Sequence, residues 1–187
     1  MLELNIKILH ELKSKNTNVC SISPKENNVI NIIPESKELG YVGTPKKINK
    51  EKILNFIKNK QIPIVVPLGL GDDGRIYNIN ADVAAGSIAK EIDARRLLLM
   101  TDVEGVLDEN QKLISEINLN RANEMLKNNI ISGGMIPKIN TCLDAISNGV
   151  RGVVIVDGRK PHSILFEIFS DTVSYTHLRA HETPINR

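Results

Sequence analysis

The sequence predicts an α/β protein, a three-layer α/β/α sandwich with a mainly parallel sheet. Two observations indicate this class. Segments with helical periodicity alternate along the chain with short runs typical of strands. Two of these runs, 62–66 and 97–100, are almost wholly apolar, as expected for strands buried on both faces of a parallel sheet. With 187 residues, 41% of them hydrophobic, the chain is long enough to bury such a core.

The elements of the first half follow from apolar spacing. Leu4, Ile8 and Leu12 recur at helical intervals, which predicts a helix over 2–15 with these side chains on its inner face. A second helix is expected over 50–60 on the same grounds. The strands expected in this half cover residues 18–22, 29–33, 39–43 and 62–66.

In the second half of the chain, polar capping residues and glycines predict where the helices begin. Asn80 can cap a helix over 81–92. The loop Ser132-Gly133-Gly134 opens a helix over 135–148, in which Pro137 is tolerated because it lies in the first turn. Further helices are expected over 119–127 and 161–169, strands over 97–100 and 153–156, and a hairpin around 108–111.

Composition excludes several classes of function. The 24 basic and 22 acidic residues nearly balance and the basic ones are scattered, which argues against nucleic acid or a membrane surface as a partner. Aromatic residues make up 3%, too few for base-stacking platforms. No apolar run approaches the ~20 residues of a membrane span. Neither Cys20 nor Cys142 has metal-ligand spacing. The N-terminal segment carries two Glu and has neither a small-residue cleavage site nor a long apolar run, so we expect a cytoplasmic protein.

The C-terminal residues break the pattern. The stretch SYTHLRAHETPINR is polar, lacks a period and resembles translated library-adapter sequence. We therefore expect a domain over residues 1–172, and a non-native or disordered tail over 173–187. His177 and His181 are spaced as helical metal ligands, but without a further ligand they predict no metal site.

Two strand-to-helix junctions, where ligands bind in open α/β sheets, carry acids and amides. Asn78 to Asp82 places two amides and an acid at a helix start, which favours anions. The structural alternative is a cap and a dipole partner. Thr101 to Leu107 places an acid and a glycine after a buried strand, where they would hold a ribose or line an adenine slot. Its alternative is a tight turn.

The third junction, Ser132 to Lys138, is the least generic. Paired glycines let the backbone approach a phosphate closely, and Lys138 in the first helical turn projects a positive charge toward it. The alternative is a flexible loop with an exposed lysine.

In this order, and followed by Val156-Asp157-Gly158-Arg159-Lys160-Pro161-His162, the three elements resemble the amino-acid kinase family, and within it the acetylglutamate kinases. The resemblance covers about residues 18–171 and includes Gly40-Tyr41-Val42-Gly43. It implies an incomplete amino-acid kinase fold that is mainly the nucleotide-binding part. It also implies ATP-dependent phosphorylation of the γ-carboxylate of N-acetyl-L-glutamate in arginine biosynthesis, with Mg²⁺ as cofactor.

The resemblance also assigns roles. Lys138 would neutralise charge on the transferred phosphoryl group, Asp82 would orient the catalytic lysines, and Asn78 would bind the acetylated amino acid. The residues that would line the ATP site are Asp102, Val103, Glu104, Gly105, Val106, Leu107, Ile130, Ile131, Ser132, Gly133 and Gly134. No metal-binding residue is assigned. Small-molecule substrates are the expected partners, and a homo-oligomer is expected for the full-length protein.

The sequence departs from the family at its start. The family's first strand, with a lysine and glycine pairs, does not precede Asn18, so we expect an N-terminally truncated chain that is inactive or nearly so by itself. Three alternatives stay open: a kinase for carbamate or acetylaminoadipate, a non-catalytic nucleotide-binding remnant, and a plain structural domain.

Overall fold

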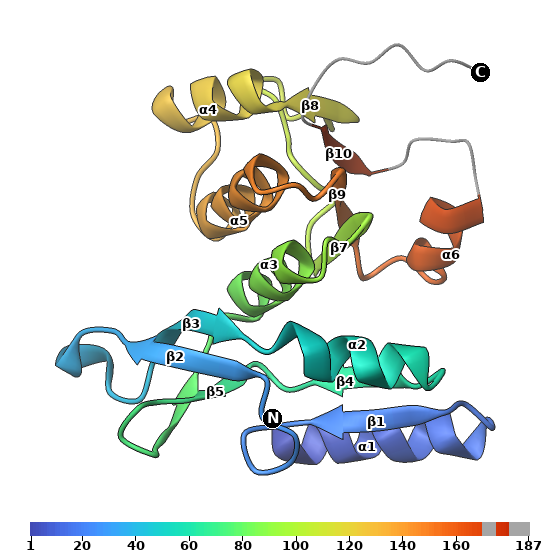
Figure 1. Ribbon diagram of the computed structural model, residues 1–187. Helices are drawn as coiled ribbons and strands as arrows, with labels where there is room; N and C mark the ends of the chain where they lie inside the picture. Colours follow the sequence, from blue (N-terminus) through green and yellow to red (C-terminus); the bar gives the residue numbers. More distant parts are fainter. Residues whose placement is uncertain (170–174, 180–187) are drawn as a thin grey trace. The chain divides into compact units, whose positions relative to one another are not determined.

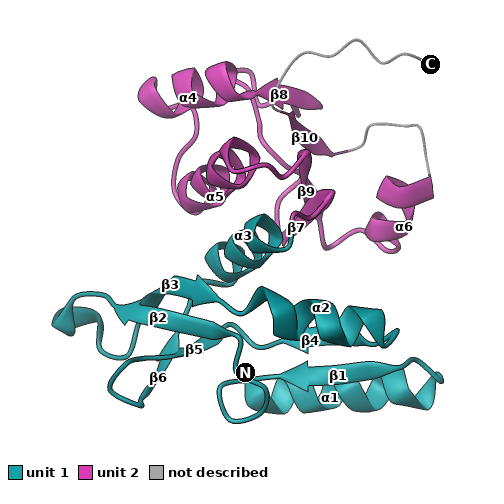
Figure 2. Cartoon of the chain, in the orientation of Figure 1, with its two compact units in different colours: residues 1–92 teal, residues 93–187 magenta. Residues whose placement is uncertain are grey.

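The computed structural model describes residues 1–169 and 175–179 and forms two compact units, residues 1–92 and 93–187 (Figure 2). The first unit contains α1 (Leu2–Ser14), β1 (Val19–Ile22), β2 (Ile30–Pro34), the short 3₁₀ helix η1 (Lys37–Leu39), β3 (Gly43–Ile48), α2 (Lys50–Lys58), β4 (Ile62–Val65), β5 (Leu68–Leu70), β6 (Ile76–Asn78) and α3 (Ala81–Glu91). These bounds confirm the predicted helices to within two residues at each end.

Two sheets organise the first unit (Figure 1). Strands β1 and β4 pair in parallel, and both α1 and α2 pack against this pair. The other sheet has the order β3-β2-β5-β6, in which the β2–β5 pair is parallel and the two outer pairs are antiparallel. Helix α3 packs on β3. Helix α3 therefore follows β6 in the chain and packs against β3, a strand of the same sheet.

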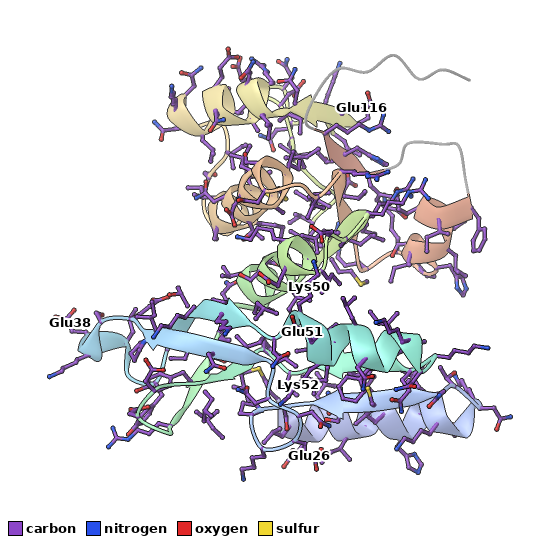
Figure 3. All side chains as sticks on the ribbon, in the orientation of Figure 1. Glu26, Glu38, Lys50, Glu51, Lys52 and Glu116 are labelled. Atoms are coloured by element: carbon purple, nitrogen blue, oxygen red, sulfur yellow. The ribbon has the colours of Figure 1, made fainter. Side chains whose placement is uncertain are left out.

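A hydrophobic core, aliphatic apart from Tyr77, joins these elements. Its buried members are Ile22, Val29, Ile30, Ile32, Ile48, Ile53, Tyr77, Ile79 and Ala84. Helix α2, which begins with Lys50, Glu51 and Lys52 (Figure 3), contributes Ile53 to this core. The Asn49 side chain caps that helix by accepting a hydrogen bond from the Lys52 N–H at 3.1 Å. Burial and capping together account for a helix of nine residues, which would be marginal in isolation.

Helix α1 forms as predicted, but its inner face is different. Asn5 is buried, whereas Leu4 is 61% exposed and Ile8 is also exposed. The Asn5 amide donates to the Ile64 carbonyl oxygen at 3.2 Å and accepts from the Ser21 hydroxyl at 2.9 Å. These bonds to β1 and β4 satisfy a buried polar group, so the helix is anchored by an amide that apolar spacing does not reveal.

The predicted strand over 39–43 is wrong. This stretch contains the end of η1 and a turn at Gly40, whose φ of +67° is a left-handed conformation that favours glycine. Strand β3 begins after the turn, at Gly43, and pairs with β2.

The second unit contains β7 (Arg96–Thr101), β8 (Glu116–Asn118), α4 (Leu119–Lys127), α5 (Met135–Ser147), β9 (Gly152–Asp157), α6 (Ser163–Phe169) and β10 (Thr176–Arg179). Its sheet has the order β7-β9-β10-β8. The β7–β9 and β10–β8 pairs are parallel, and β10 runs antiparallel to β9. Helices α4 and α5 cover one face of this sheet and α6 lies on the other, which gives three layers (Figure 1).

Strand β10 lies within residues 173–187, which the sequence predicts to be a non-native or disordered tail, so residues 176–179 at least are ordered. The Leu178 side chain and Thr176 are buried. The Thr176 hydroxyl donates to the Ile114 carbonyl oxygen at 2.8 Å. An alternation over four residues is too short to predict a strand, yet two flanking strands supply its hydrogen bonds. Residues 170–174 and 180–187, with His181 among them, lie outside the described residues.

The predicted α/β class is confirmed, with parallel pairs extended by antiparallel neighbours in both units. Across the described residues, no helix combines the length and apolarity needed to cross a bilayer.

Candidate functional site

The first group of predicted site residues lies where β6 meets α3, in the first unit. Asn78 is the exposed last residue of β6, and its backbone N–H donates to the Tyr41 carbonyl oxygen at 2.8 Å. Asn80 caps α3 by accepting from the backbone N–H groups of Asp82 at 2.9 Å and Val83 at 3.2 Å. Asp82 therefore lies in the first turn of α3, where a carboxylate complements the helix dipole.

The second group lies at the carboxyl ends of β7 and β9, in the second unit. These strands pair in parallel up to Thr101 and Asp157, so the loops that follow leave the same edge of the sheet. The Gly158 N–H donates to the Thr101 carbonyl oxygen at 2.8 Å and ties the two loops together. Asp102 and Glu104 are exposed on the first loop.

Gly105 is required by the turn itself. Its φ is +144°, and a Cβ at this position would lie 2.7 Å from both the Leu113 Cδ1 and the Thr176 Oγ1 atoms. The next residue, Val106, is buried, and its N–H donates to the same Thr176 hydroxyl at 2.9 Å. Packing and backbone conformation thus explain this glycine without a ligand.

The glycine pair before α5 is different, because a Cβ added to either glycine would meet no atom within 4 Å. Gly133 has φ +55°, and Gly134 is the N-cap residue without any side-chain hydrogen bond to the helix. The glycines therefore leave open space at the start of α5, although the Met135 and Ile136 N–H groups donate at 3.2 Å to the Ser132 and Gly133 carbonyl oxygens and Pro137 has no N–H. The positive end of the helix dipole still favours an anion beside the glycines.

Lys138 lies on the first turns of α5 and is 8% exposed. Its Nζ donates a long hydrogen bond of 3.5 Å to the Met100 carbonyl oxygen, near the carboxyl end of β7. The burial argues against the alternative of a flexible loop with an exposed lysine. It also brings an ammonium group to the sheet edge that carries Asp102.

Ile130 and Ile131 connect α4 to α5. Both donate their backbone N–H groups to the Met125 carbonyl oxygen, and Ile131 is buried in the core. Backbone hydrogen bonds therefore tie both isoleucines to the C-terminal part of α4, and Ile131 packs in the core.

The same edge of the sheet also carries an ion pair that was not predicted from the sequence. The Asp157 carboxylate is almost fully buried and accepts from the Arg159 Nε and Nη2 atoms at 2.9 Å each. These hydrogen bonds from Arg159 lower the pKa of Asp157 to about 2. Asp157, and to a smaller extent Glu104 and Asp102, raise the pKa of Arg159. The Asp-x-Arg sequence begins at the last residue of a buried strand, but this spacing by itself does not reveal that the carboxylate is buried.

The Asp157 pair predicts acid sensitivity. The folded-state pKa of about 2 is below the ordinary 3.8, so the stabilisation is complete above pH 4 and is lost as the pH falls toward 2. In urea unfolding between pH 2 and 5, Asp157→Asn should be less stable than the parent at pH 5, and the difference should shrink on acidification. The exposed Glu109→Gln is the matched control. A constant difference over this range would contradict the assignment.

Within residues 93–187 the structure thus gathers a buried ammonium, an uncapped helix start, a glycine pair and an acidic loop around the carboxyl ends of two parallel strands. A cationic group beside the positive end of a helix dipole favours phosphate binding. Residues 1–157 match the model of the Amino acid kinase family. The chain belongs to this family.

Two individual proteins of this family are similar to the chain over most of its length. The chain is 52% identical over 179 residues to an acetylglutamate kinase of Pelagibacter ubique (strain HTCC1062), which covers 96% of this chain and 62% of that protein. It is 43% identical over 174 residues to an acetylglutamate kinase of Clostridioides difficile (strain 630), covering 91% of this chain and 61% of that one. The chain thus spans less than two thirds of the length of these relatives.

Solved structures confirm the amino-acid kinase fold. The protein smu.665 from Streptococcus mutans UA159 is 30% identical with a TM-score of 0.78, over 92% of this chain and 65% of that one. An N-acetylglutamate synthase from Neisseria gonorrhoeae, complexed with coenzyme A and N-acetyl-glutamate, has a TM-score of 0.81 over 97% of this chain and 44% of that one. At 19% identity the second likeness concerns the fold alone.

Proposed function

We propose that this chain contributes the nucleotide-binding part of an enzyme that phosphorylates the γ-carboxylate of N-acetyl-L-glutamate with ATP. The observation that carries the proposal is the buried Lys138 ammonium at the carboxyl end of β7, on a helix that the glycine pair opens. The names of the two relatives above supply the acceptor.

In the proposed reaction, a carboxylate oxygen of the acceptor attacks the γ-phosphorus of ATP. The bond from that phosphorus to the β,γ-bridging oxygen breaks, and ADP leaves with the electron pair. The acceptor carboxyl has a pKa of about 4 and is ionised at neutral pH, so the step needs no general base. The obstacle is repulsion between two anions, and catalysis depends on positioning and on offsetting negative charge.

Residues of this chain fit those two tasks. Lys138 and the dipole at the start of α5 would offset charge on the terminal phosphate, and the open space beside Gly133 and Gly134 lets the phosphate approach the backbone. Asp82 would orient cationic groups from the start of α3, and Asn78 would hold the acceptor. The pairing of Asp82 with Lys138 across a phosphate stays a prediction.

The loop after β7 would hold the nucleotide's ribose and base through Asp102 to Leu107. Magnesium, when bound, would supply positive charge that offsets the charge of the phosphates. Over residues 1–169 and 175–179 no three acidic, His or Cys side chains cluster as metal ligands. Exposed carboxylates such as Asp102 and Glu104, together with the phosphates themselves, fit an ion that keeps several waters and uses few protein ligands.

The proposal is tested by joining the chain to the N-terminal segment of the Pelagibacter ubique relative and trapping acyl phosphate with hydroxylamine. N-Acetylglutamate should be the preferred acceptor over carbamate and N-acetylaminoadipate. Preference for either of those would overturn the acceptor assignment.

Measurements on this chain without the added N-terminal segment test nucleotide binding separately from catalysis. ATP with Mg²⁺ should raise its melting temperature, while we expect little or no acyl phosphate. If ATP gives no thermal shift, the nucleotide site itself is wrong. Turnover at ordinary enzyme rates would instead contradict the expected inactivity of this chain.

A further inference from the structure

A second cationic site lies within residues 93–187, at the opposite edge of the sheet. A cavity of about 260 Å³ is lined there by Arg95, Arg96, Arg151, Gly152, Val153, Val154, His177, Leu178 and Arg179. Arg96 begins β7, Arg151 directly precedes β9, and Arg179 pairs with Gly152 at the end of β10. Three segments far apart in the sequence therefore bring four guanidinium groups to one cavity.

This cavity is separate from the nucleotide site. Strands β7 and β9 are parallel, and their register runs from Arg96 and Gly152 at one end to Thr101 and Asp157 at the other. At a rise of about 3.3 Å per residue, the two ends of β7 are about 16 Å apart. A phosphate beside Lys138 would therefore not reach the arginines.

The cavity carries more positive than negative charge. Glu167 lies 3.6 Å from an Arg96 guanidinium nitrogen and 3.1 Å from the His177 Nε2 atom. Glu116, labelled in Figure 3, lies 3.6 Å from Arg179. Among the described residues, no carboxylate lies within ion-pairing distance of Arg95 or Arg151. In the part of the chain that the structure describes, two carboxylates therefore lie within ion-pairing distance of these four arginines.

His177 adds a buried polar atom to the wall. Its Nε2, despite lying 3.1 Å from Glu167 Oε2, has no partner with hydrogen-bond geometry among the described residues. Burial lowers the pKa of His177, an effect that the neighbouring Glu167 partly opposes. The imidazole is therefore neutral at physiological pH, and the surplus charge comes from the arginines.

We propose that this cavity binds a small phosphate-type anion, either inorganic phosphate or pyrophosphate. Guanidinium groups present planar pairs of donors that match phosphate oxygens. The volume of about 260 Å³ is below the roughly 300–1,000 Å³ typical of drug-sized ligands, which favours a small anion over a whole nucleotide. Arg95, Arg96 and Arg151 precede residue 173, so most of the charge lies in the part that resembles the family.

The test is calorimetric titration of the chain with phosphate and with pyrophosphate at fixed ionic strength. The double variant Arg95→Gln/Arg151→Gln should weaken binding of the preferred anion by roughly tenfold or more, because charge-assisted hydrogen bonds are lost. The matched control Lys112→Gln/Lys127→Gln removes the same charge from exposed positions of the same unit and should bind like the parent.

Two further variants keep the result interpretable. Arg151→Lys retains charge and fold but loses the paired donors, and should weaken binding severalfold. Lys138→Ala should leave the arginine-dependent part of the binding unchanged, because that lysine belongs to the nucleotide site. The proposal is overturned if neither anion binds saturably, if the lysine control weakens binding as much as the arginine variant, or if Lys138→Ala abolishes it. The last outcome would assign the signal to the nucleotide site.

Discussion

Replacing Lys138 with alanine should reduce the rate of acyl phosphate formation by about 10²–10³-fold in the completed enzyme, the usual effect of removing one charge-stabilising donor. The reason is the position of the ammonium group, buried on α5 and hydrogen bonded to the carboxyl end of β7. At such a site its electrostatic effect is stronger than in water. The measurement is kcat at saturating ATP and N-acetylglutamate.

Two variants control this experiment. Lys127→Ala removes an exposed lysine from the last turn of α4 and should leave kcat unchanged. Lys138→Arg keeps the charge and should retain more activity than the alanine variant. Circular dichroism checks that each variant is folded. An unchanged kcat in folded Lys138→Ala would remove the main support for the proposed site.

Gly105→Ala should lower the free energy of unfolding by about 1–3 kcal/mol. A methyl group would lie 2.7 Å from both Leu113 and Thr176, and the backbone φ of +144° is one that alanine adopts poorly. Because Thr176 also accepts the Val106 N–H, moving it aside would break a buried hydrogen bond. The unfolding free energy from urea titration is the appropriate measure.

Gly134→Ala is the matched comparison. Gly134 has φ −66°, and an added Cβ would meet nothing within 4 Å, so stability should change little. The same methyl group would stand in the open space beside the helix start, and ATP should raise the melting temperature less than in the parent. Equal losses of stability at both glycines would show that the Gly105 turn is not strained.

Much of the fold could be predicted because periodic segments and caps are local signals. The range predicted for α4 matches the observed one, and Asn80 caps α3 through two backbone N–H groups. Helix α1 shows the limit of this reasoning, since its buried contact is the amide of Asn5 with partners on β1 and β4. Such a contact depends on segments far along the chain.

The candidate site likewise contains some residues that the sequence predicts and others that it does not. Lys138 and the glycine pair are recognisable from their spacing, and their burial and open space agree with an anion site. The role of Gly105 in packing was not predictable, because Leu113 and Thr176 approach it only in the folded chain. Asp157 and Arg159 are two residues apart, yet their importance depends on burial at the end of β9, which spacing alone does not indicate.

The strand order of the second unit has a consequence for synthesis. In the described part of the chain, β8 joins the sheet through β10, although Glu116–Asn118 precede β10 by almost sixty residues. During translation those residues leave the ribosome well before their hydrogen-bonding partners exist. The described sheet of the second unit is therefore complete only after β10 emerges, and ribosome-bound chains stalled before Thr176 should be unusually sensitive to proteases.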